Sequence, residues 1–211
     1  MNHYKRLIVV LAGAFLVSSL IGCGKSTEPT ETTPTDTMAT ATLALPEQAP
    51  SARLPAGVSP SHYKLQLSID PRESNFSGTA EIDIVLSGST DYFWMHGNEL
   101  EVSSARATLA NGETVNLQWQ KASETGVVKV TAAQALPAGK LLLQLEYSAP
   151  FNTSLEGLYT VTEGGQAYAF TQFEATSARL AFPSFDEPGF KVPFDIELTI
   201  PAEYSGISNT P

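Results

Sequence analysis

Residues 63–69 read Tyr63-Lys64-Leu65-Gln66-Leu67-Ser68-Ile69, an unbroken alternation of apolar and polar side chains. A period of two places one face of a strand on a core and the other in water. The same alternation recurs in residues 80–86, 141–147 and 194–200. A helical period of 3.6 residues is not convincing anywhere in the folded part of the chain. We therefore predict an all-β fold, an antiparallel β-sandwich.

Two pairs of turn residues support this prediction. Asn111-Gly112 separates the apolar stretches 105–109 and 114–119, and Gly164-Gly165 separates 158–161 from 167–170. Both pairs tolerate the positive φ angles of a tight β-hairpin turn. Each pair of stretches is therefore expected to form a hairpin.

The segment that follows the second hairpin does not fit the strand pattern. Residues 171–194 contain Pro183, Pro188 and Pro193 among phenylalanines and charged residues. Proline lacks the N–H that a sheet requires, so a structured loop is predicted there. Long ordered loops on a β-scaffold often carry binding groups.

The region before the first strand is different in composition. Residues 25–53 are rich in Thr, Pro, Ala and Glu and have few large apolar side chains. Such a stretch buries too little apolar surface to offset its conformational entropy. We expect residues 23–53 to be a disordered tether and residues 54–211 to be the folded domain.

The amino terminus has the pattern of a secreted lipoprotein. Lys5 and Arg6 precede the apolar stretch 7–21, and Leu20-Ile21-Gly22-Cys23 resembles the lipobox of bacterial lipoproteins. The resemblance implies a signal peptide at residues 1–22 and lipidation at Cys23, the only cysteine in the chain. The alternative is an ordinary signal peptide with a chance cysteine. The expected location is the bacterial cell envelope, and Gly24 in place of Asp favours the outer membrane, facing the periplasm.

Composition excludes several other classes. Of 211 residues, 42% are hydrophobic and 16% are charged, which excludes a coiled coil and a wholly disordered chain. The net charge is −10. A nucleic-acid-binding protein needs a basic surface to replace counterions on phosphates, so we expect no nucleic-acid partner.

The loop also resembles a known family. It contains four strings: Thr171-Gln172-Phe173-Glu174, Ala178-Arg179, Phe182-Pro183-Ser184-Phe185-Asp186-Glu187-Pro188 and Phe190-Lys191. Together they resemble the signature of the aminopeptidase N family of zinc metallopeptidases (gluzincins). Shorter upstream strings agree in order, so the resemblance covers residues 54–211. Ser184 departs from the cysteine of many relatives, at a position that is not catalytic.

This resemblance implies a saddle-shaped N-terminal β-domain lying over a separate thermolysin-like catalytic domain. In the family, that second domain holds one zinc ion with an H-E-x-x-H motif and a distant glutamate. Neither this motif nor the G-A-M-E-N exopeptidase motif occurs here, and His62 and His96 lack the spacing of a zinc site. We expect an N-terminal fragment whose β-domain is incomplete at its C-terminus and which is inactive alone, with no catalytic or metal-binding residue.

The resemblance assigns substrate binding to Glu174 and Gln172. In the family, the glutamate of this string binds the free α-ammonium of the substrate, and the glutamine lines the pocket for the first side chain. From the residue pattern alone, Glu174 would be a loop glutamate that caps backbone amides or faces water. Gln172 would be a strand-end amide. Arg179, Asp186 and Glu187 are predicted to form a structural ion network that holds the loop.

The function predicted from the resemblance is that of a membrane-anchored zinc aminopeptidase that removes N-terminal amino acids from peptides. This segment would cap the active site and bind the substrate's amino group. One alternative is a lipid-anchored β-sandwich that acts as a binding module without catalysis. Another is a natural truncated product that binds peptide ends without cleaving them. Continuation of the reading frame into an H-E-x-x-H motif would distinguish the enzyme from the module.

Overall fold

The computed structural model describes residues 41–208. Within them lie ten strands and one short 3-10 helix: β1 (Val58–Ser68), β2 (Asn75–Leu86), β3 (Thr90–His96), β4 (Glu101–Leu109), β5 (Thr114–Lys121), β6 (Val127–Leu136), β7 (Gly139–Pro150), β8 (Gly157–Glu163), β9 (Gln166–Gln172), η1 (Ala178–Leu180) and β10 (Phe194–Thr199). The predicted all-β fold is confirmed. The predicted signal peptide, residues 1–22, and Cys23 lie outside the described residues.

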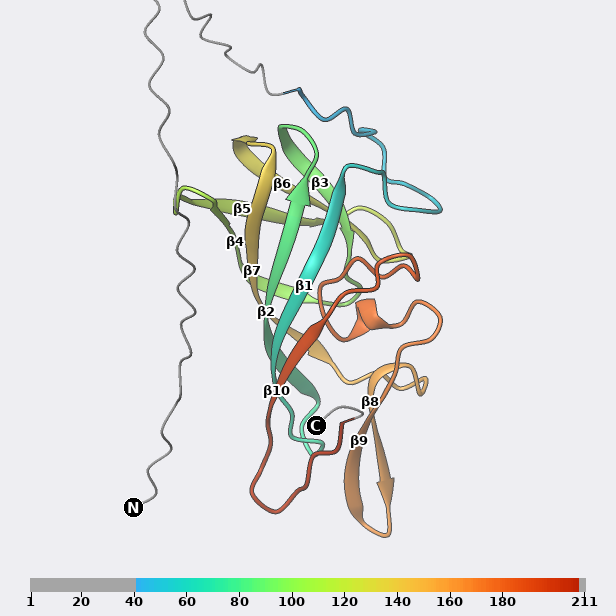
Figure 1. Cartoon of the computed structure of the whole chain (residues 1–211). Coiled ribbons are helices and arrows are strands. Elements are labelled where there is room, and N and C mark those ends of the chain that lie inside the picture. Colours follow the sequence, from blue (N-terminus) through green and yellow to red (C-terminus); the bar gives the residue numbers. More distant parts are fainter. Residues whose placement is uncertain (1–40, 209–211) are drawn as a thin grey trace, which may run out of the picture. The chain divides into compact units, whose positions relative to one another are not determined.

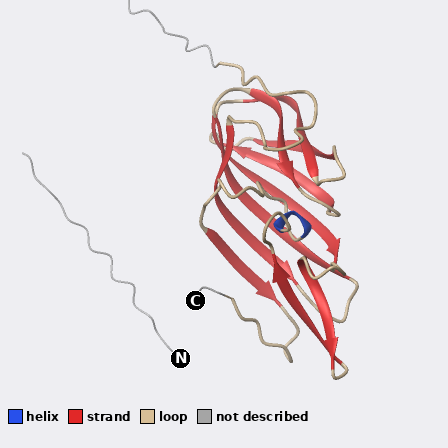
Figure 2. Cartoon of the chain, turned by 90° about the vertical axis from the view of Figure 1, so that its right-hand side faces the viewer, coloured by secondary structure: helices blue, strands red, loops and turns tan. Residues whose placement is uncertain are grey.

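Eight of the strands form one sheet in the order β10-β1-β2-β7-β4-β5-β6-β3, and β8 and β9 form a separate hairpin (Figure 1). Neighbours in the sheet are antiparallel, except that β10 runs parallel to β1. The sheet curls into a half-barrel (Figure 2). The expected sandwich is therefore a single curled sheet, because one twisted sheet can cover its own inner face.

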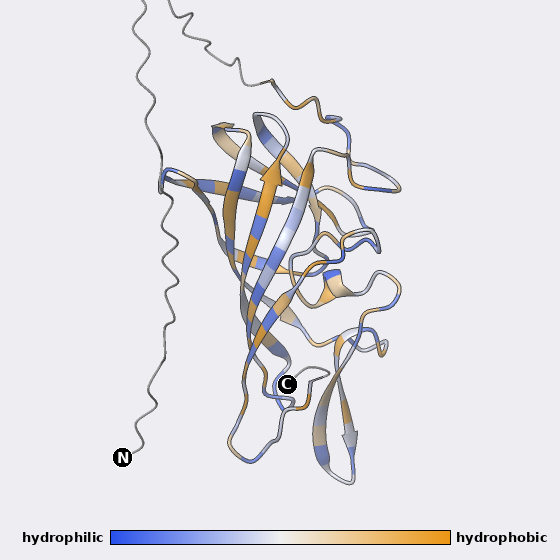
Figure 3. Cartoon of the chain, viewed as in Figure 1, coloured by the Kyte–Doolittle hydropathy of each residue, from blue (hydrophilic) through white to orange (hydrophobic). Residues whose placement is uncertain are grey.

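The core lies inside this curl. The apolar residues of the predicted alternation, such as Leu65 in β1, Ile82 in β2 and Leu143 in β7, are almost completely buried, and polar residues between them face outward. Figure 3 shows hydrophobic and hydrophilic segments alternating along these strands. Full burial of one Leu or Ile side chain stabilises a fold by roughly 1.5–3 kcal/mol. The alternation thus selects which face of the sheet turns inward.

The proline-rich loop, residues 173–193, joins β9 to β10 and is hydrogen-bonded to both β3 and β1. His96 at the end of β3 exchanges two backbone hydrogen bonds with Ser184, of 2.7 and 2.9 Å. The backbone N–H of Phe185 donates to the hydroxyl of Tyr63 in β1, at 2.9 Å. Burial raises the pKa of the Tyr63 hydroxyl well above its usual value. The loop is therefore ordered by β3 at one edge of the sheet and by β1, the strand next to the opposite edge.

An ion pair fixes the loop's own conformation. Arg179 Nε lies 2.9 Å from Asp186 Oδ2, and the two side chains are only 12% and 10% exposed. Arg179 also donates to the carbonyl of Thr125, at 2.8 Å. The pairing of Arg179 with Asp186 agrees with the predicted network. Glu187 takes a different role, because its carboxylate accepts the backbone N–H of Leu54.

Part of the expected tether packs on the domain. The backbone N–H of Leu43 donates to Ser89, and the side chains of Tyr92 and Trp94 in β3 donate to the carbonyls of Leu45 and Pro46. We call residues 41–46 the strap. The prediction of disorder as far as residue 53 was wrong for the strap, because aromatic donors in β3 satisfy its backbone carbonyls. Of the rest of the expected tether, residues 47–53 are described and lead into β1, and residues 23–40 lie outside the described residues.

The exposure of strand β10 differs from what its sequence predicts. Its alternation predicts a strand with one buried face, and its apolar residues do share a face with the core residues of β1. However, Phe194, Ile196 and Leu198 remain 43%, 51% and 38% exposed. The alternation identified the strand correctly, but the elements within residues 41–208 cover its apolar face only in part, through the packing of Phe182 against Phe194.

Candidate functional site

Gln172 is the last residue of β9, at the base of the β8–β9 hairpin. It pairs with Gly157 across the hairpin, and its side chain is exposed. Gly157 has a φ angle of +66°, and a Cβ atom there would lie 2.6 Å from Cβ of Leu180 in η1. Only glycine lets the hairpin lie this close to η1. The close approach places Gln172 at the junction between hairpin and loop.

Glu174 follows two residues later, in the turn that leaves the hairpin. Its side chain is exposed. The turn is closed by a backbone hydrogen bond from Ser177 to Phe173, at 2.9 Å. The peptide bond between Glu174 and Ala175 is cis. The side chain of Glu174 is thus exposed to solvent on an ordered turn. The hydrogen bond that closes the turn joins Ser177 to Phe173 and does not use the Glu174 carboxylate.

The groups on either side of Glu174 are fixed by packing. The ring of Phe173 packs edge-on against buried Phe182, with centroids 5.6 Å apart. Ser177 is buried, and its hydroxyl bonds to the carboxylate of Glu156 at 3.3 Å. A charged group on a supported turn needs little reordering to bind a ligand.

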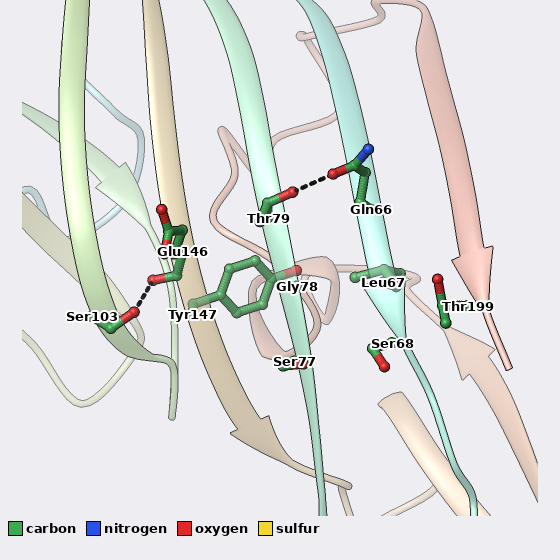
Figure 4. Close-up of a pocket in the computed structure, with 10 residues that line it drawn as sticks. All are labelled: Gln66, Leu67, Ser68, Ser77, Gly78, Thr79, Ser103, Glu146, Tyr147 and Thr199. Atoms are coloured by element: carbon green, nitrogen blue, oxygen red, sulfur yellow. Dashed lines mark hydrogen bonds between the residues drawn. The ribbon is translucent and has the colours of Figure 1, made fainter. Parts of the chain in front are cut away.

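Two shallow hollows lie elsewhere in the described part of the chain. One, of about 380 Å³, crosses strands β10, β1, β2, β7 and β4 and is lined mainly by small polar side chains (Figure 4). The other, of about 440 Å³, lies beside the strap. Neither is lined by Gln172 or Glu174. Both residues are exposed at the surface of this chain.

The two histidines in the described residues lie in different environments. His96 is buried, and its Nδ1 accepts the backbone N–H of Asp186 at 3.1 Å. Burial, with a smaller contribution from nearby Arg179, lowers the pKa of His96 to about 4. His62 lies at the surface, with Nε2 3.1 Å from Asp195 Oδ2 and Nδ1 3.9 Å from Asp83 Oδ2.

These surroundings do not fit a zinc ion. Residues 41–208 contain no cluster of three or more His, Cys, Asp or Glu side chains that could hold a metal. The Nδ1 atom of His96 is already used as an acceptor, and the two carboxylates near His62 approach different nitrogens of its ring. A zinc site needs three or four converging ligands.

One feature that the sequence analysis did not predict is the gathering of aromatic side chains on one face of the hairpin. Tyr168 and Phe170 alternate with Ala167 and Ala169, and the strand period puts both aromatic residues on the face that carries Gln172. The alternation itself was visible in the sequence. The alternation predicts the strand, but it does not specify which of the two faces stays exposed.

The fold is an all-β domain in which an ordered turn after the β8–β9 hairpin carries the exposed carboxylate of Glu174. Comparison with known families adds that residues 59–211 match the model of the Peptidase M1 N-terminal domain. The match covers most of the chain. This chain belongs to that family.

Curated relatives agree with the match. The chain is 35% identical to the glutamyl aminopeptidase of Homo sapiens and to endoplasmic reticulum aminopeptidase 1 of Mus musculus, each over 75% of its own length. It is also 35% identical over 76% of its length to aminopeptidase M1-B of Oryza sativa subsp. japonica. In each case the aligned region spans 18% of the relative. The chain thus corresponds to the N-terminal domain of much longer aminopeptidases.

Proposed function

We propose that this chain is the N-terminal domain of a membrane-anchored zinc aminopeptidase. In this proposal the domain covers the active site, Glu174 binds the α-ammonium group of the peptide, and Gln172 lines the pocket for the first side chain. The observation that carries it is Glu174, exposed on a supported turn in a chain that belongs to the M1 N-terminal family. Three aminopeptidase relatives support the assignment.

The chemistry of the pair suits an exopeptidase. A carboxylate and an ammonium form charge-assisted hydrogen bonds, each contributing about 1.5–3 kcal/mol where water is excluded. A second domain lying over Glu174 would exclude that water. Only the end of a peptide presents this cation beside the first peptide bond, so the contact also selects where cleavage occurs. Gln172, a neutral amide, can donate or accept without favouring either charge on the first side chain.

The zinc ion belongs to the proposed catalytic domain outside this chain. When bound there, it would supply the Lewis acidity and activated water of metal-assisted hydrolysis. Glu174 would orient the peptide without taking part in bond cleavage. On this proposal the present chain is inactive alone.

The anchor is the second part of the proposal. Residues 1–22 would direct export, and Cys23 would carry the lipid, which places the domain in the bacterial cell envelope, at the outer membrane facing the periplasm. Residues 24–40 would act as the tether as far as the strap. Among the described residues, no helix is long and apolar enough to cross a membrane. Mass spectrometry of the membrane-extracted protein should find a diacyl or triacyl modification on a new N-terminal Cys23.

The sharpest test of the site is kinetic. In the complete gene product, Glu174→Ala should lower kcat/KM for free-amine substrates at least about tenfold, because one charge-assisted contact is lost. Glu73→Ala, which removes an exposed carboxylate from the turn before β2, is the control and should leave kcat/KM unchanged. Equal kcat/KM for Glu174→Ala and the unsubstituted enzyme would remove Glu174 from the site.

The binding-module alternative is tested by the size of the native protein. An antibody against residues 54–211 should detect a band several times heavier than 22.5 kDa in source membranes. A band near 22.5 kDa would favour a binding module without peptidase activity.

A further inference from the structure

We infer that one face of the β8–β9 hairpin binds the peptide beyond its first residue and favours basic and aromatic side chains there. This face, formed by Tyr159, Tyr168 and Phe170, is called the aromatic face. The inference rests on the proposed function, because it extends the site that begins at Gln172 and Glu174.

The pairing of the hairpin gathers these rings. Tyr159 lies opposite Phe170, and their ring centroids are 5.8 Å apart. Tyr168 is two residues before Phe170 on β9, with ring centroids 6.5 Å apart. Because residues two apart on a strand share a face, Gln172 continues the same row. The aromatic face therefore leads directly to the turn that carries Glu174.

The rings are exposed although the hairpin has a buried side of its own. Tyr168 and Phe170 are 43% and 48% exposed, whereas Leu158 on the opposite face is buried. Ala169, on the side of Leu158, packs partly against the core. In Figure 2 the hairpin projects beyond the curled sheet. The hairpin thus docks through its small and aliphatic residues and leaves its aromatic residues at the surface.

The charge of the hairpin indicates which ligand the aromatic face would bind. Residues 156–174 contain Glu156, Glu163 and Glu174 and no Lys or Arg. Aromatic rings attract cations through their faces and stack on other rings, and nearby carboxylates add to the attraction for cations. The complementary ligand is a peptide with a free amino terminus followed by Lys, Arg or aromatic residues.

Strand geometry gives the direction and reach. With its amino terminus at Glu174, a peptide passing over Gln172, Phe170 and Tyr168 runs antiparallel to β9, toward the turn at Gly164-Gly165. Six strand residues extend about 20 Å, which matches roughly six residues of an extended peptide. The second to fifth residues of the peptide would therefore lie over the aromatic face.

Peptide binding by the full 211-residue chain tests the inference. The probes are C-terminally labelled peptides, one beginning Ala-Lys-Phe-Lys and the other Ala-Ser-Gly-Ser, each also in an N-acetylated form. Fluorescence anisotropy gives the Kd. We expect the basic-aromatic peptide to bind more tightly and acetylation to weaken binding of both.

The variants separate the two parts of the site. The double variant Tyr168→Ser/Phe170→Ser should weaken binding of the basic-aromatic peptide at least about fivefold and leave the Ala-Ser-Gly-Ser peptide unchanged. Ile207→Ser, which removes an exposed apolar side chain outside the hairpin, is the control. Glu163→Lys reverses a charge at the far end of the hairpin without changing a ring. It should also weaken binding of the basic-aromatic peptide.

The outcomes distinguish the inference from the proposed function. If the double variant and Glu163→Lys bind the basic-aromatic peptide normally while acetylation still weakens binding, the inference is wrong and the role of Glu174 stands. If acetylation and Glu174→Gln change nothing, the inferred orientation on this chain fails, whereas the role of Glu174 in the complete enzyme is decided by the kcat/KM of Glu174→Ala. No binding of any peptide overturns the inference. Normal binding with reduced self-association of the double variant would assign the aromatic face to a protein contact and also overturn it.

Discussion

The two edges of the eight-stranded sheet differ in how far other parts of the chain cover them. At the β3 edge, the strap and the proline-rich loop bond to the strand, and buried His96 and Trp94 both have hydrogen-bond partners. At the opposite edge, β10 pairs with β1 alone within the described residues and leaves Ile196 half exposed. The β3 edge is therefore covered by the chain's own residues, whereas the apolar face of β10 is open to contact with another protein segment.

The two edges also differ in whether a substitution is expected to change the stability of the fold or its binding. The β3 edge contains the buried ion pair and buried histidine, whose removal would destabilise the fold. The β10 edge and the β8–β9 hairpin hold exposed apolar residues and exposed carboxylates, whose removal should change binding more than stability. Substitutions at the β3 edge should therefore change mainly the free energy of unfolding, and substitutions at the β10 edge mainly association with other segments.

The largest effect is expected at the closed edge. Arg179→Ala leaves the buried carboxylate of Asp186 without its partner and should lower the free energy of unfolding by about 3–5 kcal/mol. Lys121→Ala breaks the exposed pair with Glu124 and should have little effect. Urea denaturation measures both. Equal stabilities for the two variants would show that the loop is held by its aromatic packing instead.

A smaller effect should depend on pH. The pKa of His96 is lowered to about 4, so the unfolded chain binds this proton below pH 6.5 before the folded chain does. Stability from the neutral ring is complete above pH 6.5 and is lost as the pH falls toward 4, by up to about 3 kcal/mol.

His96→Asn tests this loss, because the Asn oxygen can replace Nδ1 as the acceptor without titrating. Unfolding free energies measured from pH 7 to pH 4 should fall less steeply for the variant than for the unsubstituted chain. Parallel curves for the two proteins would contradict the assignment.

The smallest change in stability is expected at the open edge. Ile196→Lys replaces a half-exposed side chain and should change the free energy of unfolding by less than about 1 kcal/mol. A charge on an edge strand opposes pairing between sheets, so residues 41–211, which retain the strap, should aggregate less with this substitution. Light scattering at rising concentration measures this, with Ile207→Lys as the control. Equal aggregation of both variants would exclude the β10 face as the cause.

Much of the fold could be predicted from the sequence because its signals are local. Alternation located β1, β2, β7 and β10, and the two turn pairs located both hairpins. The curl of a single sheet and the parallel pairing of β10 depend on contacts between residues far apart. Alternation within one strand does not specify those contacts.

The site was predicted by resemblance and not by local pattern. Gln172 and Glu174 do lie together at the base of the hairpin, but their binding roles stay predictions. The strap was missed because it is a short segment within a stretch rich in Thr, Pro and Ala. Its order comes from Leu43 and Leu45, which pack against the core, and from Tyr92 and Trp94, some 50 residues away. The aromatic face was missed because alternation was used to predict a strand and not to ask which face stays exposed.

The pairing of β1 with β10 has a consequence for how the protein is made. Tyr63 in β1 lies beside Phe194, and its hydroxyl accepts the amide of Phe185, so β1 depends on residues more than a hundred positions later. Folds dominated by such distant contacts form slowly, and their unpaired strands are exposed until the last segment arrives. Once β1 has left the ribosome and paired with β2, its other edge must therefore be kept from other strands until the loop and β10 have emerged.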